Sequence, residues 1–122
     1  MTLKELYEGI GGDYEQAMRV LRMEKLLDKH IRKLPGSGVV ARLIDAGAKM
    51  DPTEMFETSH AVKGSCANLG LTRLSALASE ISEEYRPGNP RKMSDAEVKA
   101  LIDKIGELYN ITIEGIRKYA EG

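Results

Sequence analysis

Residues Glu57 to Gly70 read E-T-S-H-A-V-K-G-S-C-A-N-L-G, and the rest of the chain can be placed around this stretch. We expect most of it to be helical. The helix is predicted to begin at Asp51-Pro52-Thr53-Glu54, where Asp51 is a good N-cap, proline suits the first helical position and Glu54 completes a capping-box-like pair. It is predicted to end at Gly70, because glycine readily takes the left-handed conformation that follows a helix.

The predicted helix has two different sides when its residues are spaced at about 100°. One side is a mainly apolar stripe of Met55, Ser59, Val62, Cys66 and Leu69. His60 falls roughly opposite this stripe, so we expect its side chain to face water. The same side also carries Phe56, Glu57, Lys63, Gly64, Ala67 and Asn68.

Gly64 breaks a local rule on the side that carries His60. A glycine inside a helix costs about 1 kcal/mol relative to alanine, and Gly64 is predicted to cap nothing. It lies one turn after His60, and Ala67 lies almost one turn further on. Small residues here leave the imidazole on a smooth surface that another protein could approach. Positions that break local rules are often functional sites.

A histidine that faces water beside a lysine is suited to holding a phosphoryl group. Neutral imidazole is a good nitrogen nucleophile near pH 7, because its unperturbed pKa is about 6.5. Phosphoryl transfer depends on positioning and on charge stabilisation. Lys63, three residues after His60, could offset part of the phosphoryl charge. The same face offers no metal cluster, no glycine-rich phosphate cradle and no second base, so a partner would have to supply the rest.

The run from His60 to Gly70 resembles the H-x-x-K-G signature, with a later glycine, of histidine phosphotransfer (HPt) domains. The resemblance implies that His60 is the phosphorylated histidine, that Lys63 lies near the phosphate and that Gly64 opens the surface. It also implies that Ala67 belongs to the docking face and that Gly70 forms the turn into the next helix. The stretch Leu6 to Asp13 with its Gly-Gly-Asp, the helical pattern and the chain length are similar to this family as well. Ser59 departs from its pattern, which more often has alanine or glycine there.

The family resemblance also implies partners and a mechanism. The Nε nitrogen of His60 would bond phosphorus, and the partner would be the receiver domain of a response regulator, a hybrid sensor kinase, or both. That receiver would bring the aspartate and Mg²⁺, so this chain needs no cofactor of its own. The protein would then be a phosphocarrier rather than an enzyme with turnover. We expect Phe56, Gly64, Ala67 and Asn68 to form the receiver-docking surface.

Composition supports one globular domain over residues 1–122. The apolar runs are too short to span a bilayer, and no basic segment followed by an apolar one opens the chain. The net charge of −1 argues against nucleic acid as the main partner. Cys66 is the only cysteine and falls on the apolar stripe, so we expect a buried, unreactive thiol and no disulfide. We expect a cytoplasmic monomer, and the start at Met1 favours a freestanding protein.

The remaining chain predicts an all-α fold, an antiparallel four-helix-bundle core with additional short helices. The other helices are predicted over residues 2–8, 14–34, 39–50, 72–85 and from Ser94, a capping-box residue, to the C-terminus. Breaks at Pro35-Gly36-Ser37-Gly38 and at residues 86–90 separate them. Val40, Leu43, Ile44 and Gly47 are expected on one side of their helix. The charges of Glu83, Glu84, Arg91 and Lys92 are interpreted as solvated.

Several side chains keep two interpretations. Phe56 is either part of a docking patch or tucked under a neighbouring helix. Glu57 is either solvated or hydrogen-bonded to the imidazole of His60, which would raise its pKa. His30 is interpreted as a partly buried core or helix-end histidine rather than a second phosphorylation or metal site. Lys63 by itself would be an ordinary surface lysine, and only the neighbouring His60 gives it a role.

Two other functions compete with the phosphocarrier. A helical adaptor could bind receivers without carrying phosphate, although such an adaptor has no need of the nucleophile His60. A metal or haem four-helix bundle would need facing Glu-x-x-His motifs that project inward. Glu57 and His60 have this spacing, but the motif occurs only once and is predicted to point outward.

Overall fold

The computed structural model describes residues 1–122 and contains helices without any β-strand. This confirms the all-α prediction. In chain order the elements are α1 (Leu3–Ile10), α2 (Tyr14–Leu21), α3 (Glu24–Lys33), the 3-10 turn η1 (Leu34–Ser37), α4 (Val39–Lys49), α5 (Pro52–Asn68), α6 (Thr72–Tyr85) and α7 (Asp95–Glu121). None of these helices combines the length and the apolar character needed to cross a bilayer.

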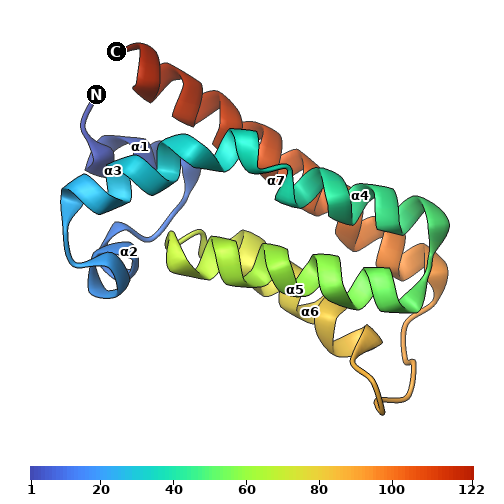
Figure 1. The fold of residues 1–122 in the computed structure, drawn as a ribbon. Helices are drawn as coiled ribbons and strands as arrows, with labels where there is room; N and C mark the ends of the chain where they lie inside the picture. The colour runs from blue at the N-terminus through green and yellow to red at the C-terminus, as the bar shows by residue number, and fades with distance from the viewer.

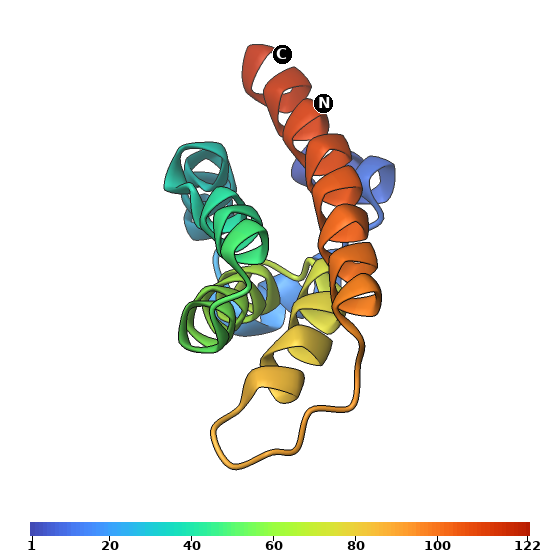
Figure 2. The same cartoon turned by 90° about the vertical axis from the view of Figure 1, so that its right-hand side faces the viewer.

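Helices α4 to α7 form an antiparallel bundle in which each helix contacts two neighbours (Figures 1 and 2). α3 continues the line of α4 on the other side of η1, and α1 and α2 cover the end of the bundle where α5 finishes (Figure 1). Every helix contributes to one cluster of buried apolar side chains. Burial of such side chains is the main stabilising contribution to a fold of this kind.

The turn after α5 is held from both sides by the N-terminal segment. The backbone N–H of Asp13 donates to the carbonyl of Gly70 over 2.8 Å, and the Tyr7 hydroxyl donates to the carbonyl of Leu69 over 2.6 Å. Gly70 has a φ of +67°, and a Cβ placed on it would lie 2.3 Å from the carbonyl oxygen of Asp13. Only glycine therefore fits this position without strain.

The single helix predicted over residues 14–34 is wrong, because the chain turns at Arg22 and Met23. Arg22 takes a left-handed conformation with a φ of 65°, and Met23 is extended. No glycine or proline marks this turn in the sequence. Its reason is tertiary, since Ala17 in α2 packs against the turn after α5, whereas α3 lies against α7. A left-handed non-glycine residue costs roughly 1–2 kcal/mol, which the separate burial of the two helices offsets.

Other local predictions are confirmed in full or in part. Asp51 caps α5 by accepting hydrogen bonds from the N–H groups of Thr53 and Glu54, but the Glu54 side chain makes no return bond to Asp51. The Ser94–Glu97 capping box is complete. Val40, Leu43 and Gly47 are buried on one side of α4, but Ile44, which was expected on the same side, is 45% exposed.

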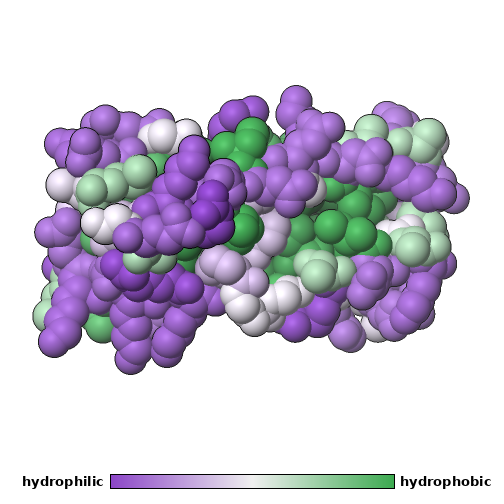
Figure 3. All heavy atoms as spheres, turned by 90° about the horizontal axis from the view of Figure 1, so that it is seen from above, coloured by the Kyte–Doolittle hydropathy of each residue, from purple (hydrophilic) through white to green (hydrophobic).

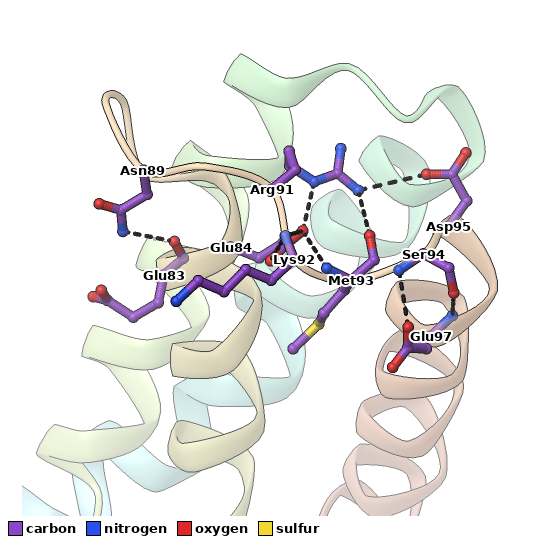
Figure 4. Close-up of polar contacts among 9 residues, drawn as sticks. All are labelled: Glu83, Glu84, Asn89, Arg91, Lys92, Met93, Ser94, Asp95 and Glu97. Carbon is purple, nitrogen blue, oxygen red and sulfur yellow. Dashed lines mark hydrogen bonds and ion pairs between the residues drawn. The ribbon is translucent and has the colours of Figure 1, made fainter.

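The connection between α6 and α7 is organised by Glu84, contrary to the expectation of a solvated side chain (Figure 4). Its carboxylate accepts hydrogen bonds from Arg91 Nε over 2.6 Å and from the backbone N–H groups of Lys92 and Met93 over 3.1 and 2.9 Å. The Arg91 guanidinium also lies over the ring of Tyr85, at 4.3 Å from its centroid. Periodicity could not predict this burial, because the donors come from seven to nine residues further along the chain.

Candidate functional site

Helix α5 has one buried side and one open side, as its sequence predicts. Met55, Ser59, Val62 and Cys66 are fully buried in it. The Ser59 hydroxyl donates to the carbonyl of Phe56 over 3.2 Å, so this polar departure from the apolar stripe is satisfied within the helix. Burial raises the pKa of the Cys66 thiol to about 12, which keeps it protonated and unreactive. His60 is exposed on the opposite side.

The imidazole of His60 stacks on the ring of Phe56, one turn earlier in the same helix. The ring centroids are 5.7 Å apart and the planes differ by 25°. Phe56 is half-buried and packs against the apolar core, so it joins the core to the surface histidine. Phe56 is therefore packed against the core, and its place in a docking patch stays a prediction. Stacking covers one face of the imidazole and leaves its edge free, and the edge carries both nitrogens.

Lys63 and Glu57 lie three residues after and before His60, and neither forms a hydrogen bond with its imidazole. Lys63 is half-buried and forms no ion pair, and its backbone carbonyl accepts a hydrogen bond from the Ser75 hydroxyl of α6 over 3.1 Å. Glu57 is exposed and makes no hydrogen bond to the imidazole, so the solvated interpretation of Glu57 is the one that the structure supports. The Lys63 ammonium is not fixed by an ion pair, and after the hydrogen-bonded Arg86 it also helps to hold the pKa of Glu83 on α6 below its ordinary value.

The residues that follow His60 on the open side of α5 have small side chains, so they protrude little from the helix. A Cβ built on Gly64 would meet no atom within 4 Å, so this position opens directly to solvent. Ala67 and Asn68 are exposed on the following turn. Gly70 is buried in the turn that ends the helix, where its left-handed backbone is needed.

Two hollows lie on either side of this open face. On the α6 side, a hollow of about 350 Å³ is bordered by Lys63 and Ala67 together with the small residues Ser75, Ala76 and Ser79. Sequence analysis did not single out these three residues of α6. Their signal was available, because small side chains recur one turn apart on a side of α6 that does not enter the core.

The second hollow, of about 250 Å³, lies on the α3 side. It is bordered by Ser65 and Asn68 of α5 and by His30 and Lys33 of α3. His30 is exposed in the last turn of α3, so it is a helix-end histidine and not a core residue. No group of three or more histidine, cysteine or carboxylate side chains is placed to hold a metal ion. Glu57 and His60 both lie on the surface of the bundle rather than in its interior.

The structure thus places the histidine and the lysine of the H-x-x-K-G run on one helix of an all-α bundle, with the histidine exposed. The family model of the Hpt domain matches residues 15–108. The match covers α2 from its second residue, all of α3 to α6, and the first half of α7. The chain belongs to the Hpt domain family. Hpt domains take part in histidine phosphotransfer in phosphorelays and interact with receiver domains and kinases. No curated protein and no solved structure matches the chain significantly.

Proposed function

We propose that this protein is a phosphocarrier in which His60 accepts a phosphoryl group from the aspartate of one receiver domain and passes it to another. The observation that carries the proposal is the exposed imidazole of His60, stacked on Phe56 within an H-x-x-K-G run of an Hpt-family chain. We also propose that residues 1–122 act as one Hpt domain. The receiver can belong to a response regulator or to a hybrid sensor kinase.

The proposed step is a displacement at phosphorus. A neutral imidazole with its proton on Nδ1 attacks through the lone pair of Nε2. A bond forms between Nε2 and phosphorus, and the bond between phosphorus and the aspartyl oxygen breaks, which returns a carboxylate to the receiver. The reverse step regenerates the free imidazole when a second receiver takes the phosphoryl group. No base is required, because the proton on Nδ1 stays in place during the step. No oxidant is required either, because no atom changes its oxidation state, and the positive charge gained by the ring is balanced by the negative phosphoryl oxygens.

Three neighbours of His60 support this step. Phe56 restricts the imidazole by stacking, which lowers the entropy cost of aligning Nε2 with the phosphorus. Lys63, one turn after His60, carries an ammonium without an ion pair that would turn toward the arriving phosphoryl group and offset its charge. Gly64 leaves room for the receiver backbone or side chains to approach. The receiver would hold the Mg²⁺ that balances the remaining phosphoryl charge.

The test uses a phosphorylated receiver and the variant His60→Gln. We expect the wild-type chain to acquire phosphate that is labile to acid and stable to base, and the variant to acquire none. His30→Gln is the matched control, since it removes the only other histidine. Phosphate uptake by His60→Gln, or its loss in His30→Gln alone, would contradict the assignment.

A small phosphodonor separates the carrier from a receiver-binding adaptor. Phosphoramidate needs no docking surface, so it should phosphorylate His60 in the wild-type chain without any receiver. A wild-type chain that binds receivers but takes no phosphate from either donor would be an adaptor.

A further inference from the structure

A hollow of about 530 Å³ lies between α1 and the C-terminal half of α7. Gly9 and Ile10 border it on α1, and Ile111 and Gly115 border it on α7. Six large hydrophobic residues of the chain are exposed, and two of them, Met1 at 57% and Ile111 at 55%, lie at this hollow. Figure 3 shows that hydrophobic surface on the side of α4 and α7 is confined to patches among hydrophilic side chains. Exposed apolar groups beside a hollow are typical of an interaction surface.

The two glycines of this hollow differ in what surrounds them. A Cβ on Gly115 would clash with the side chain of Ile10, so Gly115 allows α1 to pack closely against α7. A Cβ on Gly9 would meet no atom within 4 Å, so packing within the chain gives no reason for a glycine there. Gly9 leaves the α1 side of the hollow low enough for another helix to approach. Both glycines lie outside residues 15–108, which match the Hpt family model.

The outer side of α7 carries a regular series of residues, which we call the α7 seam. Its members are Lys104, Glu107, Ile111, Glu114, Lys118 and Glu121. All of them are exposed, and they lie on the side of α7 opposite its buried residues. Their alternating spacing of three and four residues places them on one line along the helix, as in a coiled coil. The hollow is therefore continuous with a straight line of exposed side chains.

Most charges of the α7 seam have no partner within the chain. Lys104, Glu107 and Lys118 form no ion pair. The other two glutamates of the seam are bound by Arg117, which lies beside the seam on the same helix. The seam thus offers two free ammonium groups and one free carboxylate, together with carboxylates that can accept further hydrogen bonds.

The charges of α1 do not give this region one dominant sign. Glu5 is held in the capping box with Thr2. Lys4 and Glu8 are exposed and add one charge of each sign. A surface with both signs interspersed is suited to a partner with the same mixed pattern rather than to a strongly charged one such as nucleic acid.

We propose that the hollow and the α7 seam form the interface of a homodimer, in which the α7 helices of two copies pack antiparallel about a twofold axis. Both copies use the same surface, so the interface is isologous. Lys104 of each copy lies opposite Glu121 of the other, and Glu107 lies opposite Lys118. The dimer replaces the monomer expected from the sequence. The proposal goes beyond the proposed function, because it does not involve His60.

The centre of this interface is apolar. The same register places Ile111 of each copy opposite Glu114 of the other, whose carboxylate is already bound by Arg117 on its own helix. Ile111 then enters the hollow of the other copy, between Met1 and Ile10. Its exposed side chain is buried in the dimer, and the charged pairs lie on either side of it, as in interfaces with an apolar centre and a polar rim.

The charges favour this arrangement over other pairings of two α7 helices. In a parallel pair, each seam residue would lie opposite its own copy, so every charged layer would bring like charges together. In an antiparallel pair centred on Ile111, Lys104 would lie opposite Lys118, which also repel. The proposed register instead pairs every lysine of the seam with a glutamate. Such like-charge contacts disfavour the wrong pairings.

The size of the interface indicates a reversible dimer. Residues 104–121 span about 27 Å of helix, and α1 and α7 side by side are about 20 Å wide. Each copy therefore contributes a footprint of roughly 500 Å², compared with about 800 Å² in a standard interface. We expect the dimer to dissociate on dilution.

The dimer leaves His60 accessible in both copies. α5 and α7 both contact α4 and α6, so they lie diagonally across the bundle (Figure 2). The α7 seam faces away from the bundle, and the open side of α5 faces away from it on the other side of the molecule. Each dimer therefore presents two separate His60 faces.

A membrane fits this surface less well than a second copy. A helix that lies on a membrane carries lysines and arginines around its apolar residues. The α7 seam has Glu107 and Glu114 on the two sides of Ile111 instead. These glutamates would meet lipid headgroups without a cationic partner, whereas in the dimer Glu107 meets Lys118.

The experiment measures the dimer dissociation constant of the full chain by sedimentation equilibrium at low salt. Lys118→Glu and Glu107→Lys each bring like charges together twice in the dimer. Glu107→Lys/Lys118→Glu restores the pair with its signs exchanged and keeps the net charge of the wild type. Lys99→Glu is the matched control for Lys118→Glu, because Lys99 is an exposed residue of α7 that lies off the seam.

We expect each single seam variant to raise the dissociation constant about tenfold, and the exchange variant to return it to within about threefold of the wild type. Lys99→Glu should leave it nearly unchanged. Ile111→Ser should raise it at low and at high salt, because an apolar contact is not screened. Circular dichroism melting checks that each variant is folded, and phosphoramidate labelling of His60 should be the same in all of them.

Several results would overturn the dimer. One is a wild-type chain that stays monomeric up to about 1 mM. Another is equal weakening by Lys118→Glu and Lys99→Glu, which would reflect net charge alone, and a third is an exchange variant that does not recover. Binding of a monomeric wild-type chain to phosphatidylcholine vesicles, lost in Ile111→Ser, would make the hollow a membrane contact instead. None of these results bears on His60, whose assignment depends on its phosphorylation.

Discussion

The open face of α5 and the connection between α6 and α7 both carry charged side chains, but the structure uses them in opposite ways. In the connection, the carboxylate of Glu84 accepts hydrogen bonds from Arg91 and from the backbone of Lys92 and Met93. On the open face, the side chains of His60 and Lys63 form no hydrogen bond or ion pair within the chain.

The difference follows from where the chain has backbone N–H groups without a hydrogen-bond acceptor in a helix. A helix satisfies its own backbone along its length, so polar side chains on its middle turns are not needed to hold the chain. The irregular segment after α6 has N–H groups without helical partners, and Glu84 supplies their acceptor. Charges in the connection therefore stabilise the fold, whereas those on α5 remain free to meet a partner.

The largest effect should come from Gly70→Ala, which tests whether the end of α5 belongs to the structural side of this comparison. The new Cβ would clash with the carbonyl of Asp13 and sit on a left-handed backbone. We expect the free energy of unfolding to fall by about 3 kcal/mol. Urea unfolding gives the value, and Gly64→Ala is the matched control. Gly64→Ala should leave stability unchanged or raise it by up to about 1 kcal/mol. Equal losses in both variants would remove the distinction between the two glycines.

Glu84→Gln should have the next largest effect and a defined dependence on pH. Burial alone would raise the pKa of Glu84, but the hydrogen bonds from Arg91, Met93 and Lys92 outweigh it and lower that pKa below its ordinary value. The stabilisation is therefore complete above the unfolded glutamate pKa of about 4.3 and is lost as pH falls through the lower folded value. We expect a loss of about 2 kcal/mol at pH 7.

Unfolding curves of wild type and Glu84→Gln at several pH values test this sign. The difference between them should shrink as the pH falls below about 4. A difference that is constant from pH 7 to pH 3 would show that the charge of Glu84 contributes nothing. Phosphorylation of His60 by phosphoramidate should be the same in both proteins, since Glu84 belongs to the connection and not to the open face.

Ala67→Arg should affect transfer without affecting stability. Ala67 is exposed two turns after His60, so an arginine finds room in the free protein. In the complex it would intrude between packed surfaces. We expect receiver-dependent phosphorylation to fall at least tenfold and phosphoramidate labelling to stay constant. Ala100→Arg, at an exposed position of α7, is the control. An unfolded Ala67→Arg variant would contradict its placement in solvent, and normal transfer would place the docking surface elsewhere.

The smallest effect should come from Lys63→Ala. Two unit charges about 4 Å apart in water interact by about 1 kcal/mol, which corresponds to roughly a fivefold change in rate. Stability should change by no more than about 0.5 kcal/mol, since Lys63 forms no ion pair. Single-turnover transfer from a saturating receiver measures the effect, with Lys104→Ala as the control. Matched rates for wild type and Lys63→Ala would remove this lysine from the mechanism.

Much of the site could be predicted from α5 alone. Its cap at Asp51, its end at Gly70 and its apolar stripe are local features of the sequence, and together they orient His60 outward. The stacking of Phe56 on His60 could not be assigned in the same way. Spacing places the two rings one turn apart, but the packing of Phe56 against the core decides how its ring is held.

Features that depend on distant residues could not be predicted. The turn at Arg22 lies inside a regular apolar period, and only the separate packing of α2 and α3 shows why the chain breaks there. Burial of Glu84 depends on donors that return from the far side of a turn. The two hollows beside α5 arise where α3 and α6 meet it, and each helix supplies only one wall.

The sequence by itself determined the all-helical class, most helix ends, the buried side of α5 and the signature around His60. Each of these depends on residues within about one or two helical turns, where periodicity and capping act directly. The tertiary structure decided the break at Arg22, the burial of Glu84 and the two hollows beside α5. These arise from contacts between segments far apart in the chain, whose free energies exceed the local preferences that a sequence pattern records.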